Sequence, residues 1–161
     1  MNSPKLNKRR NRHLDSLIDF IANILIDEGY TIKKEKTTIT EAYSKRCDLI
    51  FSSGAAGILE FKSISSSFGK NYNNRIEEMA GQAWLLKNAC DGFGYVFVYH
   101  DITEEYKYYK KIKNFCRHLL MNNLMAYCML IKVSGNNVEI DETYGLKQLI
   151  DTVTTQEITD C

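Results

Sequence analysis

The stretch that decides the fold is CDLIFSSGAAGILEFKS, residues 47–63. Two short runs, 46–52 and 57–64, are rich in Leu, Ile and Phe, and the small residues SSGAAG lie between them. Apolar runs of this length that flank Gly and Ser are typical of paired strands joined by a turn. The stretch therefore predicts two adjacent strands joined by a tight connection.

Acidic and basic residues interrupt these apolar strands at Asp48, Glu60 and Lys62. Side chains alternate between the two faces of a strand, so Glu60 and Lys62 are expected on one face and Phe61 in the core. Asp48 begins the first strand and can reach the same face. Two close carboxylates repel each other unless one is protonated or a cation lies between them. The alternative is an inert surface hairpin with an ion pair between Glu60 and Lys62.

A hard divalent cation such as Mg²⁺ takes oxygen ligands and commonly uses only one or two protein carboxylates. Such an ion neutralises a phosphate and lowers the pKa of a bound water. The Lys62 ammonium is then placed to orient the attacking water or to stabilise the transition state. This combination predicts phosphodiester hydrolysis with Mg²⁺ or Mn²⁺ as the cofactor.

Helical and strand-like patterns alternate along the rest of the chain. Apolar residues recur at three- and four-residue spacing in some segments, and short β-branched or aromatic runs form others. The predicted helices are 14–28, 73–88, 103–121 and 144–153, and the further strands are 30–40, 93–99, 125–133 and 138–140. The order α-β-β-β-α-β-α-β predicts an α/β fold, with a mixed central sheet flanked by helices.

Asp48, eleven intervening residues and then Glu60-Phe61-Lys62 resemble the motif of the PD-(D/E)xK nuclease superfamily. This superfamily includes restriction endonucleases, archaeal-type Holliday junction resolvases and RecB-type exonucleases. The resemblance covers roughly residues 13–100, and Cys47 stands where the motif usually has proline. It implies a restriction-endonuclease-like core, with Asp48, Glu60 and Phe61 as metal-binding positions and Lys62 as the catalytic lysine.

Two further expectations follow from the resemblance. Many members present a Gln or Lys from the helix after the motif, and Gln82 takes that place here, on one helical face with Arg75. Some members add an acid from the first helix, for which Asp15 and Asp19 are the candidates. The alternatives are that Gln82 is a polar residue on a helix edge and that the two aspartates lie on a solvated helix face.

Positive charge is concentrated at the N-terminus of a chain whose formal net charge is only +1. Residues 1–13 form a predicted basic arm, and residues 14–161 form a single predicted domain. Without the five arm cations the chain has 16 basic and 20 acidic residues, a net charge of −4. A polyanionic partner is therefore expected to meet the arm, although a solvated tail or an import-type patch explains it equally well. The five cations are Lys5, Lys8, Arg9, Arg10 and Arg12.

The expected partner is nucleic acid, and DNA is favoured over RNA. The polar loop 63–74 contains Lys70 and precedes Arg75, and such a segment suits contacts with backbone phosphates. A chain of 161 residues is expected to cut two strands as a homodimer. A nuclease acting on RNA or on single-stranded ends remains an alternative, as does a catalytically silent nucleic-acid-binding or assembly module.

The sequence predicts an intracellular, reducing compartment. No apolar run approaches the 18 to 20 or so residues that span a bilayer, so no membrane association is expected. No apolar segment typical of a secretion signal follows the basic N-terminus. The five cysteines are an odd number and lack metal-ligand spacing, which favours reduced thiols.

Deletion of residues 1–12 should weaken DNA binding and make it less sensitive to salt. If all five cations contact phosphates, the slope of log affinity against log salt should shrink by about four, at roughly 0.9 per contact on duplex DNA. Binding measured from about 50 to 200 mM salt, for the full and shortened chains, gives this slope. An unchanged slope would show that the arm is only a solvated tail.

Overall fold

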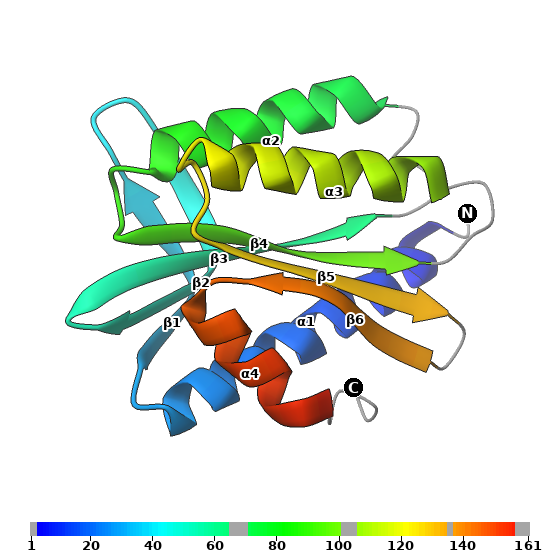
Figure 1. Cartoon of the computed structure of the whole chain (residues 1–161), viewed down its shortest axis with the longest axis horizontal. Coiled ribbons are helices and arrows are strands. Elements are labelled where there is room, and N and C mark those ends of the chain that lie inside the picture. The colour runs from blue at the N-terminus through cyan, green and yellow to red at the C-terminus, as the bar shows by residue number, and fades with distance from the viewer. Residues whose placement is uncertain (1–2, 65–70, 101–105, 135–136, 157–161) are drawn as a thin grey trace.

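The computed structural model describes residues 3–64, 71–100, 106–134 and 137–156 and shows one central sheet with helices on both faces (Figure 1). In this part of the chain, no helix is both long and apolar enough to span a membrane. The helices are α1 (Ser3–Asp27), α2 (Tyr72–Leu86), α3 (Tyr106–Met121) and α4 (Leu146–Gln156). The strands are β1 (Thr31–Ile39), β2 (Ser44–Ser53), β3 (Ala55–Ile64), β4 (Gly92–His100), β5 (Tyr127–Ser134) and β6 (Asn137–Tyr144).

The sheet has six strands in sequence order, β1 to β6. β1, β2 and β3 form an antiparallel meander, β3, β4 and β5 are parallel, and β6 returns antiparallel to β5. Parallel neighbours need a crossover connection, and α2 and α3 provide the two that are required here. The predicted α/β class, with a mixed sheet flanked by helices, is confirmed.

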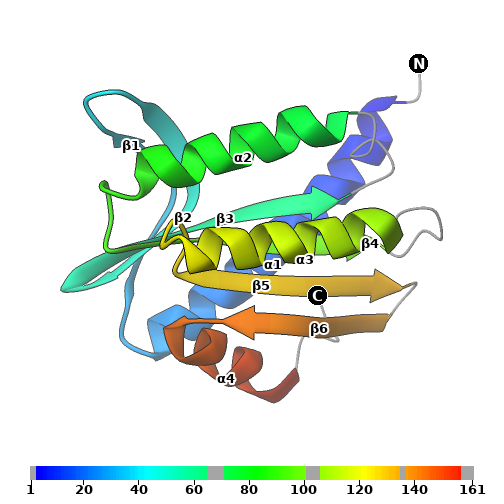
Figure 2. The same cartoon turned by 45° about the horizontal axis from the view of Figure 1, so that its top comes forward.

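Two separate apolar layers cover the sheet. Figure 2 shows α2 and α3 side by side over one face, while α1 and α4 lie on the other. Strand β4 contributes to both layers: Tyr95 and Phe97 belong to the layer under α2 and α3, and Val96 and Val98 to the layer against α1. All four are buried, as expected for a continuous apolar run in a central strand.

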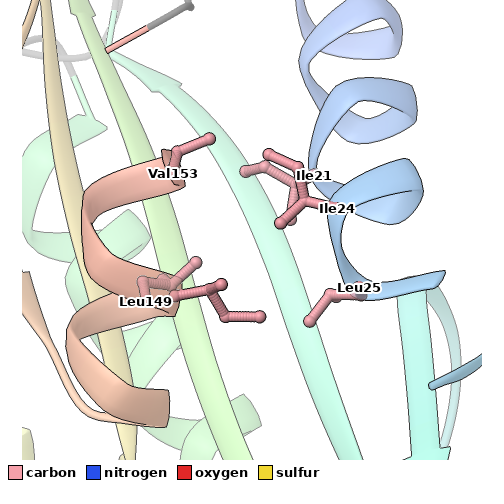
Figure 3. A pocket seen from close by; sticks show the side chains of 6 residues that line it. Ile21, Ile24, Leu25, Leu149 and Val153 are labelled. Atoms are coloured by element: carbon pink, nitrogen blue, oxygen red, sulfur yellow. The ribbon is translucent and has the colours of Figure 1, made fainter. Parts of the chain in front are cut away.

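Aliphatic side chains of α1 and α4 face each other across a small pocket (Figure 3). The facing residues are Ile21, Ile24, Leu25, Leu149, Ile150 and Val153. The backbone of α4 has φ angles of 40–52° at Leu146–Asp151, Val153 and Thr154. That left-handed conformation costs L-residues roughly 1–2 kcal/mol each. None of the residues predicted for the site lies on α4.

Several predicted boundaries differ from the structure. The first helix begins at Ser3 rather than at residue 14, so the predicted arm is part of α1. The predicted six-residue turn was wrong, because β2 and β3 pair as far as Ser53 and Ala55 around Gly54, whose φ is 81°. The last strand, predicted to have three residues, has eight because its pairing with β5 extends to Tyr144.

Replacement of Gly94 by alanine should destabilise the sheet. A Cβ atom there would overlap the backbone carbonyl oxygen of Tyr127 on β5, which cannot move without disturbing the ladder. We expect a loss of about 1–3 kcal/mol in urea denaturation. Gly81→Ala is the matched control, because its Cβ would meet nothing within 4 Å. In a helix interior alanine is more stable than glycine by about 0.5–1 kcal/mol, so this variant should not lose stability. Equal stabilities of the two variants would contradict this packing.

Candidate active site

Asp48 and Glu60 join β2 to β3 through side-chain hydrogen bonds. Regular pairing of the two strands reaches Leu49 and Leu59. Beyond that point, the Asp48 backbone N–H donates to Glu60 Oε1 at 3.0 Å, and the Phe61 N–H donates to Asp48 Oδ2 at 2.9 Å. Each carboxylate therefore accepts a backbone hydrogen bond from the opposite strand, and the two acids are held close together.

Strand alternation places Glu60 on the sheet face under α2 and α3. Ile58 and Ile64, at even spacing from Glu60, belong to the apolar layer under these helices. Leu59 and Phe61 point the other way, into the layer against α1. Lys62 shares the face of Glu60, so the side assignments predicted for the motif agree with the structure.

Glu60 is almost completely enclosed, with 1% of its surface exposed. Its Oε2 lies 3.0 Å from Nζ of Lys45, a residue of β2 that is itself mostly covered. Sequence reasoning missed Lys45 because it lies an odd number of residues before Asp48, and alternation places it on the opposite face. The alternation breaks here, since Cys47 and Ile50, three residues apart, both pack in the layer under α2 and α3. Opposite this point, Glu35 of β1 has a φ of 49°.

The pKa of Glu60 is raised above its ordinary value. Burial is the main cause, and repulsion from Asp48 adds to it, while the Asp48 N–H and the Lys45 ammonium only partly offset them. Burial works to lower the pKa of Lys45, yet attraction to Glu60 outweighs it and the pKa is raised. The two shifts are compatible, because one ammonium faces two carboxylates. Around Glu60, two carboxylates therefore face the single ammonium of Lys45.

An open cleft of about 300 Å³ lies beside the motif. It is lined by Lys62 and Ser63 at the end of β3 and by Arg75, Glu78 and Met79 on α2. The structure thus brings two of the predicted cations, Lys62 and Arg75, to one cleft.

Gln82 faces the protein interior and is only 6% exposed. Its Oε1 lies 3.3 Å from the Tyr95 hydroxyl, and its Nε2 donates to Glu78 at 3.1 Å. Tyr95 is the partner of Glu60 across the β3–β4 ladder, and its pKa is raised, mainly by burial and then by the charge of Glu60. Gln82 is therefore a buried residue one side chain away from the carboxylates, rather than a polar residue on a helix edge.

The two candidate acids of the first helix are exposed on α1. Asp19 forms an ion pair with Lys34 of β1. Because α1 packs on the face opposite Glu60, the structure does not bring Asp15 or Asp19 together with the motif. Of the predicted nucleic-acid contacts, Lys70 lies outside the described residues, and four fall on α1 in the part whose side chains are not described: Lys8, Arg9, Arg10 and Arg12.

The donor set fits a hard divalent cation with few protein ligands. Asp48 and Glu60 offer carboxylate oxygens at adjacent positions, and Mg²⁺ commonly binds through one or two carboxylates, with water completing its shell. Among residues 3–64, 71–100, 106–134 and 137–156, no three His, Cys, Asp or Glu side chains are grouped to hold a metal ion. The four described cysteines, Cys47, Cys90, Cys116 and Cys128, are free thiols.

Comparisons with known proteins give one structural neighbour. The crystal structure of an XisH family protein from Nostoc punctiforme aligns with 80% of this chain and 98% of its own, at a TM-score of 0.45 and 11% sequence identity. No protein-family model matches the chain. No curated protein gives a significant sequence match.

The buried Glu60 should make the stability of the metal-free protein depend on pH. A folded pKa above the ordinary 4.5 means that the stability contributed by Glu60 is complete below 4.5 and is lost as pH rises through the folded pKa. Wild-type protein should therefore lose stability relative to Glu60→Gln over this window. Urea denaturation in a chelator between about pH 4 and pH 8 measures the difference. Glu77→Gln, which changes an exposed acid on α2, is the control. Parallel curves for wild type and Glu60→Gln would contradict the burial of a charged group.

Proposed function

We propose that this protein is a divalent-metal-dependent nuclease that hydrolyses phosphodiester bonds, with DNA favoured over RNA. The observation that carries the proposal is the reciprocal bonding of Asp48 and Glu60 across β2 and β3, next to Lys62 at a cationic cleft. Paired acids followed by a lysine on the same strand face are also the pattern that resembles the PD-(D/E)xK motif.

Different residues of the chain would bind the ion, position the carboxylates and contact the phosphate. Asp48 and Glu60 would hold the ion, and Mg²⁺ or Mn²⁺, when bound, supplies charge neutralisation and a water of lowered pKa. The backbone N–H groups of Asp48 and Phe61 fix the two carboxylates, so that little reorganisation is needed. Lys62 lines the cleft and would place its ammonium against the reacting phosphate. Arg75, across the same cleft, would hold a neighbouring phosphate.

The proposed assembly is a homodimer. Cutting both strands of a duplex requires two sites of the same chemistry, and a two-fold axis that relates two copies of the chain matches the pseudo-symmetry of the two strands. The basic residues of the N-terminal segment would add further phosphate contacts.

A catalytically silent nucleic-acid-binding module is the second candidate. Both oxygens of Glu60 already have partners, the Asp48 N–H and the Lys45 ammonium, and the carboxylate is enclosed. A permanently satisfied carboxylate would bind no ion. On this reading, Lys62 and Arg75 bind phosphate without cleaving it.

Asp48→Asn and Glu60→Gln should abolish cleavage and weaken Mg²⁺ and Mn²⁺ binding, because each removes ligand charge and preserves shape. Both should leave the fold intact, and either can tighten metal-free DNA binding by removing repulsion. Lys62→Ala should lower the cleavage rate by a factor on the order of 10² or more and keep metal binding. Calorimetry for the ions, DNA binding with and without metal, and nicking of supercoiled plasmid give the three readouts.

Glu77→Gln is the matched control, because it removes an exposed acid that lies outside the cleft. It should cut and bind ions like the wild type. If the wild type binds no divalent ion and cuts neither DNA nor RNA, the nuclease proposal fails and the silent module stands. If the wild type cuts and the Asp48 and Glu60 variants cut at full rate, the active site lies elsewhere.

A further inference from the structure

Lys45 forms an ion pair with the buried carboxylate of Glu60. Its Nζ is 3.0 Å from Glu60 Oε2 and 3.5 Å from the carbonyl oxygen of Arg46, its own neighbour in the chain. The Glu60 side chain is 1% exposed and the Lys45 side chain is 17% exposed. The ammonium therefore reaches a buried carboxylate from a side chain that keeps contact with solvent.

Of the two partners, Lys45 has the longer side chain and the greater exposure. Glu60 lies in the middle of β3 and is fixed by the Asp48 N–H on its other oxygen. Lys45 lies one residue from the start of β2, and its four-carbon stem can swing the ammonium outward without moving the backbone. If this ion pair breaks, the Lys45 ammonium therefore moves away and Glu60 stays in place.

A divalent ion and the Lys45 ammonium compete for Glu60 Oε2. Both are cations, and two cations at ligand distances repel each other. Glu60 Oε1 already accepts the Asp48 N–H, and Oε2 is the oxygen that the ammonium contacts. An ion that binds Oε2 therefore favours the departure of Lys45.

We propose that Lys45 is an internal counter-cation, which neutralises Glu60 in the metal-free protein and is displaced from it when Mg²⁺ binds. The inference rests on the proposed function, because it assumes the ion site at Asp48 and Glu60. Lys45 thereby keeps the carboxylate ordered between binding events and sets the ion affinity by competition.

Lysine labelling of the wild-type protein tests the displacement directly. Acetylation by a short activated ester, read by mass spectrometry, should be slow at Lys45 in a chelator and several-fold faster with saturating Mg²⁺ at matched ionic strength. Lys33, exposed on β1, is the internal reference and should label equally in both conditions. This readout needs no variant and no catalytic activity.

Lys45→Met tests the competition. Removing a unit charge about 3 Å from a ligand oxygen should tighten Mg²⁺ and Mn²⁺ binding by about tenfold, even if the repulsion is calculated with the dielectric constant of water. Calorimetry measures this affinity. The same variant should melt roughly 5–10 °C lower in a chelator, because Glu60 is left buried without a counter-charge. The double variant Lys45→Met/Glu60→Gln should recover much of that loss. Arg46→Gln is the control, since Arg46 is the next residue of β2 and its exposed ion pair is with Glu35 of β1.

The outcomes separate this inference from the function on which it rests. Wild-type protein that binds Mg²⁺ while Lys45 labelling and the Lys45→Met affinity stay unchanged overturns the displacement and leaves the nuclease proposal standing. Wild-type protein that binds no divalent ion overturns both. If Lys45→Met does not fold, the labelling ratio on the wild type decides alone, and a ratio of one refutes the displacement.

Discussion

The charge of a carboxylate buried in a sheet has to be offset by hydrogen bonds or an opposite charge, and the buried Glu60 imposes this constraint on the surrounding strands. Its neighbours in sequence, Leu59 and Phe61, are buried in the apolar layer on the opposite face of the sheet. Strand β2 supplies two groups that offset its charge, a backbone N–H at Asp48 and an ammonium at Lys45. The register between β2 and β3 therefore has to place both groups opposite Glu60, since a slip of one residue would turn Glu60 into the wrong layer.

The two apolar layers make this arrangement rigid. β4 is covered on both faces and lies next to β3, so Tyr95, the ladder partner of Glu60, packs beside it in the layer under α2 and α3. The Tyr95 hydroxyl is itself held, 2.8 Å from the Met79 carbonyl oxygen and within reach of Gln82. The polar groups of α2 and β4 thus form one connected set behind the carboxylates.

Periodicity was enough to predict the layers and the motif, because both depend on regular alternation. The order of elements and the shared face of Glu60 and Lys62 follow from a period of two in strands and 3.6 in helices. Lys45 escaped prediction because the alternation breaks between Cys47 and Ile50, and no local pattern signals such a break. The burial of Gln82 depends on a tyrosine thirteen residues away, a tertiary contact that helical spacing does not encode. The first helix was predicted from residue 14, and its earlier turns, residues 3–13, were missed because they have no apolar stripe.

Charge balance is what separates an ion-binding site from a structural ion pair here. A structural pair would be neutral, as it is for the exposed Arg46 and Glu35 on neighbouring strands. At the motif two carboxylates share one ammonium, and Glu60 still has a raised pKa despite that partner. Protonation of Glu60 or a further positive charge would restore balance, and only the second also uses Asp48. Two carboxylates that are held close together and share one ammonium are costly for folding, which favours a site that is completed by a ligand over one that is complete in itself.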